Sequence, residues 1–325
     1  MSLPEIAVAT LGGTLSLQRG RPGAGALPPP GSEILLAHLP ELAQLAQIQV
    51  DSLSLLPSAS LDIEQLQRVL GWANHQVEQG AQGIVITQGT DTLEETATLL
   101  DYLWPHPEPL VLTGAMRPAG QAGADGPANL LDACRVAVDS HSRGRGALVV
   151  MNARLHAAGQ VRKTDALALD AFCSPSSGPT GLIIEERVHY LHGAAPRRVL
   201  PRPQRITHKV ALLEASLSAD TALLEQVLAL DYAGLVVAGF GAGHVSANWS
   251  HALEAIAARI PVIVASRTGA GATARSTYGF AGGEMDLARK GVHLAGLLCP
   301  RKARLLLWLL IGCGRQHELP AWLQP

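Results

Sequence analysis

Lysine is scarce in this chain of 325 residues, and the only lysines are Lys163, Lys209, Lys290 and Lys302. With so few lysines in the chain, a lysine that falls within a motif of reactive residues is a notable candidate for a chemical role. Lysine and arginine total 25 residues against 27 aspartates and glutamates, so the formal net charge at pH 7 is −2. Because no excess of positive charge is available to attract polyanions, nucleic acid is a poor expectation as a partner.

The cysteines are also few, and their spacing fits neither a zinc site nor a disulfide framework. The four are Cys134, Cys173, Cys299 and Cys313, with no C-x-x-C pair and no paired Cys/His spacing. We therefore expect no metal, and a reducing compartment is the simplest interpretation.

Long hydrophobic runs are absent. The longest one, Leu305–Ile311, is far shorter than the roughly 20 residues that span a bilayer. Near the N-terminus, the apolar stretch Ile6–Ala9 is too short for the core of a signal peptide, and no cationic segment precedes it. These features predict a soluble cytoplasmic protein without a membrane partner.

The sequence does contain enough apolar material for a large core, since 47% of its residues are apolar and 16% are charged. At about 150 residues per domain, this length predicts about two domains, and the composition excludes a disordered chain. Short runs rich in Val, Ile and Leu alternate with longer amphipathic stretches. This pattern is typical of an α/β protein in which a mostly parallel sheet lies between helices.

The first and larger domain is predicted over residues 1–192. Five strands are expected, at Ile6–Ala9, Ile48–Leu53, Gly83–Thr87, Leu110–Thr113 and Ala147–Met151. Helices are expected between them, at Glu33–Ala46, Asp62–Gln79, Leu93–Leu103 and Asn129–Ser140. Ser32 and Ser60 are the expected N-caps of the first two helices, and Gly80 should end the second.

A second, smaller α/β domain is predicted over residues 209–325. Strand patterns at Gly181–Glu186 and Val188–His192 are followed by a segment rich in proline and glycine, which predicts a linker over residues 193–208. Beyond it, strands are expected at Val210–Glu214, Gly234–Ala238 and Val262–Ala265, and helices at Thr221–Ala229, Ser246–Ala258 and Arg301–Ile311.

The first candidate for chemistry comes directly after the first strand, where the segment Thr10–Thr14 contains two adjacent glycines. Paired glycines let backbone N–H groups turn inward, and a hydroxyl is offered at the carboxyl end of a strand, where open α/β sheets bind ligands. A tight turn with an incidental threonine is the alternative interpretation. The segment does not match a phosphate-binding loop, because no lysine follows it.

The segment Gly83–Ala97 is richer in candidate groups. A buried strand leads to Gly89, and Thr90 and Asp91 follow at the start of a helix. Gly89 allows close backbone approach, the helix N-terminus favours negative charge, and Thr90 places a hydroxyl beside a carboxylate. The competing interpretation is that Thr90 or Thr92 merely caps the helix while Asp91 interacts with the helix dipole.

Two further segments add polar groups. The stretch Val111–Pro118 runs from a strand into Gly114, although an ordinary loop is its alternative interpretation. The stretch Gln160–Asp165 contains the rare Lys163, for which a solvated surface lysine is the usual explanation. Near a carboxylate, however, a lysine can take part in proton transfer. Hydroxyls at three strand ends together with a lysine suggest a mechanism in which a threonine attacks a carbonyl carbon.

These motifs closely resemble the bacterial-type L-asparaginase/glutaminase family of threonine amidohydrolases, and matching segments extend from residue 6 to the last helix. The motifs are Thr10–Thr14, Ile86–Thr96, Gly114–Pro118 and Arg162–Thr164. The second motif is highly specific to the family. The resemblance implies an enzyme that hydrolyses L-asparagine to L-aspartate and ammonia, with glutaminase side activity. It also implies that the enzyme needs no metal or cofactor and forms a homodimer or homotetramer.

The resemblance also implies a role for each matched residue. Thr14 is the expected nucleophile, which forms the acyl-enzyme. Thr90, Asp91 and Lys163 are expected to act together in proton handling, with Asp91 also holding the substrate α-amino group and the Thr90 N–H stabilising the oxyanion. The remaining residues expected to bind substrate are Ser58, which would hold the α-carboxylate, Gly89 and Ala115.

The chain departs from the family's pattern at a few positions. Leu11 is an additional residue in a motif usually written Thr-Gly-Gly-Thr, and Ala59 stands where a glutamine commonly assists substrate binding. The loop after Thr14 lacks the tyrosine that closes the site in the best-known members, since the first tyrosine of the chain is Tyr102. We therefore expect different lid chemistry.

In the second domain, the resemblance makes two segments candidates for reaching the site of a neighbouring subunit. Gly239–Val245 would need a glycine at position 244 to match the dinucleotide pattern G-x-G-x-x-G, but His244 stands there, so NAD binding is rejected. His244 falls where the best-known members carry an asparagine near the substrate, although a lone loop histidine is more often structural. In Ser276–Glu284, Glu284 is the candidate carboxylate for a substrate α-amino group.

Two other functions stay open at this point. A non-catalytic amino-acid sensor on the same fold would keep Ser58 and Asp91 and dispense with the nucleophile and the lysine, but Thr14 and Lys163 are both present. An amidotransferase subunit that supplies ammonia to a charged tRNA would usually carry an added domain, and no basic tRNA-facing surface is evident. The sequence therefore favours the amidohydrolase.

Overall fold

The computed structural model describes residues 2–13, 18–19, 26–27 and 39–323. By its internal contacts the chain divides into two compact units, residues 1–199 and 200–325. Four of the predictions fall at least partly outside the described residues: the nucleophile Thr14, the lid chemistry of the loop after it, the N-cap Ser32 and the first part of the helix over Glu33–Ala46.

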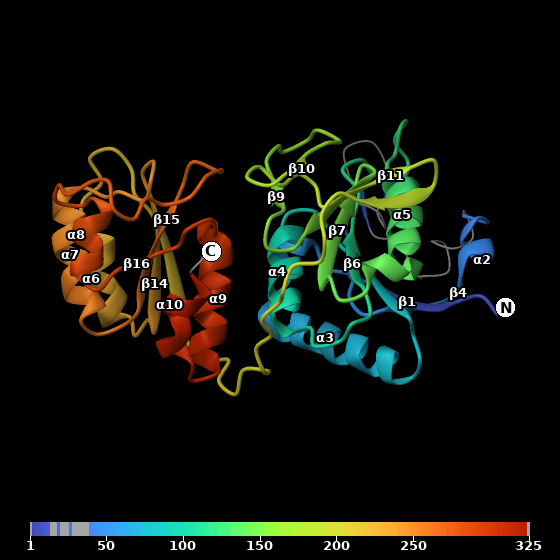
Figure 1. The fold of residues 1–325 in the computed structure, drawn as a ribbon, viewed down its shortest axis with the longest axis horizontal. Helices are drawn as coiled ribbons and strands as arrows, with labels where there is room; N and C mark the ends of the chain where they lie inside the picture. Colours follow the sequence, from blue (N-terminus) through green and yellow to red (C-terminus); the bar gives the residue numbers. More distant parts are fainter. Residues whose placement is uncertain (1, 14–17, 20–25, 28–38, 324–325) are drawn as a thin grey trace. The chain divides into compact units, whose positions relative to one another are not determined.

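An eight-stranded sheet forms the centre of the first unit, in the order β12-β11-β8-β7-β6-β5-β1-β4 (Figure 1). Its parallel strands are β1 (Glu5–Thr10), β4 (Gln47–Ser52), β5 (Gly83–Thr87), β6 (Leu110–Thr113) and β7 (Ala147–Met151). The antiparallel strands that extend it are β8 (Arg154–Ala157), β11 (Gly181–Ile184) and β12 (Arg187–Tyr190).

Helices cover the parallel strands of this sheet. They are α2 (Leu42–Leu45), α3 (Ile63–Glu78), α4 (Leu93–Leu103) and α5 (Gly126–Val138). Leu130 and Ala133 of α5 share a hydrophobic core with Val85 and Val111, while α4 lies against β6 and β7 and α3 against β1 and β5. Every residue of β5, β6 and β7 is buried, as expected for strands that pack on both faces.

The second unit contains a smaller sheet of four parallel strands in the order β13-β14-β15-β16. The strands are β13 (Val210–Glu214), β14 (Gly234–Gly239), β15 (Val262–Ser266) and β16 (His293–Leu294). The helices are α6 (Ala222–Ala229), α7 (Ala247–Ala257), α8 (Glu284–Arg289), α9 (Pro300–Gly312) and α10 (Leu319–Trp322). Leu235 and Val237 pack with Trp249 and Leu253 of α7, and α9 lies against β13, β14 and β15.

Several short elements complete the described parts of the chain. β9 (Arg162–Lys163) pairs antiparallel with β10 (Phe172–Cys173), and β2 (Gln18–Arg19) pairs with β3 (Ala26–Leu27). The 3-10 helices are η2 (Ser58–Ser60), η3 (Ser140–Ser142) and η4 (Gln316–Glu318). Within the residues described, no helix is long and apolar enough to cross a membrane.

The predicted α/β fold, with a large N-terminal sheet and a smaller C-terminal one, is confirmed. The prediction that Ser60 caps α3 is wrong, because Asp62 is the N-cap. The Asp62 carboxylate accepts a hydrogen bond from the Gln65 N–H at 2.7 Å, and the Gln65 side chain accepts one from the Asp62 N–H at 2.8 Å. This capping box satisfies two N–H groups at once. At the other end, Gly80 ends the helix with a φ of +108°, as predicted.

Candidate active site

The candidate site begins where β1 and β5 end. The two strands are parallel neighbours with Thr10 opposite Thr87, so the segments that follow them leave the sheet at the same edge. Gly13 lies so close to Gly89 that a Cβ atom at position 13 would overlap the Gly89 backbone. Gly13 also has a φ of +92°, which L side chains rarely adopt. This close approach therefore requires glycine at position 13.

Ser58 also lies against Gly89. It is buried in η2, at 2% exposure, and a Cβ atom at Gly89 would lie 2.7 Å from the Ser58 hydroxyl oxygen. That hydroxyl accepts a hydrogen bond from the Asp91 N–H at 3.1 Å, and the Thr92 hydroxyl donates to the Ser58 carbonyl at 2.9 Å. The segment around Ser58 is therefore held against the loop that follows β5.

Lys163 reaches this loop from the hairpin of β9 and β10. Its Nζ donates a hydrogen bond to the Thr90 hydroxyl at 2.9 Å and lies 3.3 Å from Asp91 Oδ1. Thr90 is 8% exposed, whereas the side chains of Lys163 and Asp91 are 18% and 64% exposed. The amine therefore contacts both a buried hydroxyl and a largely exposed carboxylate, an arrangement suited to moving a proton to or from the hydroxyl.

The simpler explanation, in which a threonine only caps α4, does not account for these contacts. Thr92 occupies the N-cap position, but its side chain makes no capping hydrogen bond. Its hydroxyl donates to Ser58 instead, and the Thr90 hydroxyl accepts from Lys163. Both hydroxyls therefore join separate segments of the chain.

The loop after β6, which contains Ala115, is held by two residues to which the sequence analysis assigned no role. The Asp125 carboxylate accepts a hydrogen bond from the Met116 N–H at 3.0 Å, and Asn129 Nδ2 donates to the Gly114 carbonyl at 3.0 Å. Ala115 itself is fully buried. Asp125 and Asn129 lie in a segment whose sequence is equally typical of an ordinary loop and helix start, so no local signal identified their role.

In the second unit, the two predicted residues His244 and Glu284 lie together, with His244 Nε2 3.3 Å from Glu284 Oε2. The Glu284 side chain is fully buried, and it accepts hydrogen bonds from the N–H groups of Thr277 and Tyr278 at 2.5 and 2.6 Å. Burial acts to raise the pKa of Glu284, but these hydrogen bonds outweigh burial and hold the pKa below its ordinary value.

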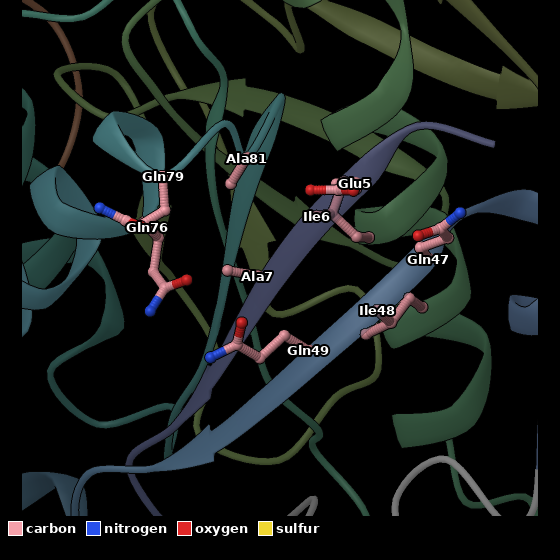
Figure 2. Close-up of a pocket in the computed structure, with 9 residues that line it drawn as sticks. All are labelled: Glu5, Ile6, Ala7, Gln47, Ile48, Gln49, Gln76, Gln79 and Ala81. Atoms are coloured by element: carbon pink, nitrogen blue, oxygen red, sulfur yellow. The ribbon is translucent and has the colours of Figure 1, made fainter. Parts of the chain in front are cut away.

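A polar pocket of about 290 Å³ in the first unit lies elsewhere. Figure 2 shows its lining, which includes Glu5, Gln47, Gln76 and Gln79 from β1, β4 and the end of α3. Glu5 and Gln47 are the first residues of their strands, whereas the candidate site lies at the carboxyl ends. None of the predicted site residues lines this pocket, so its presence does not bear on the candidate site.

A metal centre was not found in the part of the chain that the structure describes, where no three His, Cys, Asp or Glu side chains form a group that could hold a metal ion. The described site consists of a lysine that links a hydroxyl and a carboxylate at the carboxyl edge of a parallel sheet. Such groups serve enzymes in which a hydroxyl attacks a carbonyl carbon.

Comparison with known proteins identifies the family. The N-terminal asparaginase model matches residues 5–196, and the glutaminase/asparaginase C-terminal domain model matches residues 209–319. The chain therefore belongs to the L-asparaginase family and is an amidohydrolase.

Individual proteins agree with this assignment. The chain is 34% identical over 318 residues to a probable periplasmic L-asparaginase from Haemophilus influenzae, covering 95% of this chain and 89% of that protein. It is 37% identical over 328 residues to a probable L-asparaginase from Deinococcus radiodurans, covering 98% and 96%. The solved structure of a probable cytoplasmic L-asparaginase from Campylobacter jejuni matches with a TM-score of 0.88 at 28% identity, covering 98% of this chain and 99% of that one.

Proposed function

We propose that the chain is an L-asparaginase that hydrolyses L-asparagine to L-aspartate and ammonia, with L-glutamine as a side substrate. The observation that carries the proposal is the contact of Lys163 Nζ with both Thr90 and Asp91. Thr90 and Asp91 follow Gly89 in the chain, and Gly13 approaches Gly89 closely. Thr14 is the residue that follows Gly13, which supports Thr14 as the nucleophile.

The reaction proceeds through an acyl-enzyme. The Thr14 hydroxyl oxygen forms a bond to the side-chain carbonyl carbon of asparagine, and its proton passes to a base. The carbon–nitrogen bond then breaks, and the nitrogen takes up a proton and leaves as ammonia. Water attacks the resulting ester, releasing aspartate and restoring the Thr14 hydroxyl. Thr90, Lys163 and Asp91 carry these protons, because the amine contacts both the hydroxyl and the carboxylate.

The residues that bind the substrate are Gly89 and residues near it. The Ser58 hydroxyl accepts the Asp91 N–H, which leaves its own O–H to donate to the substrate α-carboxylate. Asp91 holds the α-amino group with its exposed carboxylate. The Thr90 N–H stabilises the oxyanion, where one donor is worth about 3 kcal/mol of barrier. Gly89 and Ala115 contribute backbone to the substrate pocket.

We also propose a homodimer or homotetramer in which His244 and Glu284 contribute to the site of a neighbouring subunit. Support comes from the rings beside His244: Tyr278 and Phe280 are 43% and 51% exposed, and aromatic rings are enriched at protein interfaces. Sedimentation analysis tests this, and a monomer that is fully active would contradict it.

A cytoplasmic location is part of the proposal. Its support is that all four cysteines are free, which suits a reducing compartment. Activity released together with periplasmic contents during cell fractionation would contradict it.

The direct test of the activity is ammonia release by the purified protein from L-asparagine and, in a separate assay, from L-glutamine. We expect faster release from asparagine. Release from neither amide, with asparagine still bound in calorimetry, would overturn the proposal and favour an amino-acid sensor on the same fold.

A further inference from the structure

Within this site, we propose that Glu94 is the positioning residue for Lys163. The proposal rests on the proposed function, because it concerns the same amine. Glu94 lies in the first turn of α4 and is 3% exposed, and its Oε2 accepts a hydrogen bond from the Lys163 N–H at 2.6 Å. Glu94 thereby ties the strand that carries the amine to the helix that follows Thr90 and Asp91.

The pairing of β9 explains why an acceptor from α4 is needed. In the hairpin, the Thr164 N–H donates to the Ala171 carbonyl at 2.8 Å. Successive N–H groups of a strand point in opposite directions, so the N–H of Lys163 is not directed at the same partner strand. It donates to Glu94 instead. Without Glu94 this backbone donor would lose its acceptor, a state that folded proteins avoid.

A second contact holds α4 against the segment that leads to Lys163. The Thr98 hydroxyl, one turn further along α4, lies 2.7 Å from the Glu94 carbonyl and 3.0 Å from the Ala158 carbonyl. Ala158 lies a few residues before β9, so α4 is tied at two points to the segment that ends at Lys163. The loop with Thr90 leads directly into this helix, and the two contacts therefore set the separation between the hydroxyl and the strand that carries the amine.

A carboxylate suits this position for two reasons. The N-terminus of α4 carries partial positive charge, which stabilises a negative group in the first turn. A hydrogen bond to a carboxylate is also stronger than one to a neutral acceptor. Because the lysine side chain is a flexible four-carbon stem, the position of Nζ depends on how firmly its backbone is held.

The test compares Glu94→Ala and Glu94→Gln with the matched pair Glu64→Ala and Glu64→Gln. Glu64 lies on α3 with a side chain 68% exposed. We expect Glu94→Ala to lower kcat about 10- to 100-fold, because small misplacements of reacting groups have effects of this size. KM should stay within about threefold, since no group that contacts substrate is removed. Glu94→Gln keeps an acceptor oxygen and should recover most of the kcat, and both Glu64 variants should match the wild type.

Deuterium exchange at the Lys163 amide provides a readout that does not depend on turnover. Exchange should be faster in Glu94→Ala than in the wild type and in the Glu64 variants. If the wild-type protein releases no ammonia, the proposed function fails, and exchange alone decides the role of Glu94. An unchanged Lys163 exchange rate, or an unchanged kcat in an otherwise active enzyme, overturns the proposal. If Glu94→Ala does not fold, Glu94→Asp, with its shorter side chain, takes its place with the same expectations.

Discussion

The two units of the chain use their charged residues differently. In the first unit, Lys163 and Asp91 come from separate segments, and the Asp91 side chain is 64% exposed. In the second unit, Glu284 is fully buried and accepts hydrogen bonds from N–H groups only six and seven positions away. A pair assembled across the fold around an exposed carboxylate leaves room for a substrate, whereas a buried carboxylate bonded to its own loop fixes that loop. Burial and the origin of the partners thus separate Asp91, which is open to a substrate, from Glu284, which fixes the loop that carries it.

Among the substitutions that test this difference between the two units, Lys163→Met is expected to have the largest effect on kcat. Removing the amine takes away the group that links Thr90 and Asp91, so kcat should fall by about 10²- to 10⁴-fold, the usual contribution of acid–base catalysis. Steady-state kinetics should show little change in KM, and Lys209→Met in the second unit is the matched control. A higher KM with an unchanged kcat would make Lys163 a binding group instead.

Gly13→Ala should have the next largest effect. A Cβ atom there would overlap the Gly89 backbone, and the φ of +92° adds strain. We expect a loss of about 3 kcal/mol in the free energy of unfolding, together with a lower kcat.

Gly144→Ala is the matched control for the strain alone. Gly144 has a φ of +74°, but among the described residues only its chain neighbours lie within 4 Å of the position that a Cβ atom would take. Its substitution should therefore lower the free energy of unfolding by only about 1–2 kcal/mol, as measured by urea denaturation. Equal losses for the two variants would mean that the contact between Gly13 and Gly89 is not tight.

The smallest expected effect is that of Glu284→Gln on the free energy of unfolding, and it depends on pH. The pKa of Glu284 is lower in the folded protein than its ordinary value of 4.5, so its ionised form stabilises the second unit above pH 4.5. This contribution is lost as the pH falls from 4.5 through the lowered pKa. Glu284→Gln keeps the shape and an acceptor but not the charge, so it should destabilise the protein at pH 7 and progressively less at acid pH.

Urea denaturation of the wild type and Glu284→Gln at pH 7, 4 and 3 measures this difference. Asp286 in the same unit is a useful internal reference. Hydrogen bonds from Ser250, Gly282 and Lys290 hold its pKa at about 2, so it stays ionised over most of this range. A difference between the two proteins that does not change with pH would contradict the account of Glu284.

Much of the fold was predictable because the buried strands of a parallel sheet are short, almost uninterrupted apolar runs. The limits of β5, β6 and β7 agree with the sequence prediction to the residue. Very short elements were not predicted: β9 and β10 have two residues each, too few for a period to be recognised. The cap of α3 was misplaced because Ser60 and Asp62 are both good N-cap residues, and only the reciprocal bond with Gln65 distinguishes them.

The site was predictable only in part. The motifs indicated Thr90, Asp91 and Lys163, and the structure brings these three together. Their supporting residues were assigned no role, because a contact such as that between Glu94 and Lys163 joins positions 69 residues apart. Thr14 lies outside the described residues, so its role as nucleophile stays a prediction.

The role of Thr14 as the nucleophile is tested by measuring ammonia release from L-asparagine by Thr14→Ala and by the wild type. Calorimetry measures asparagine binding to both proteins. Loss of an attacking hydroxyl should nearly abolish turnover and leave binding largely intact, because Ser58 and Asp91 are unchanged. Undiminished ammonia release by Thr14→Ala would contradict the account.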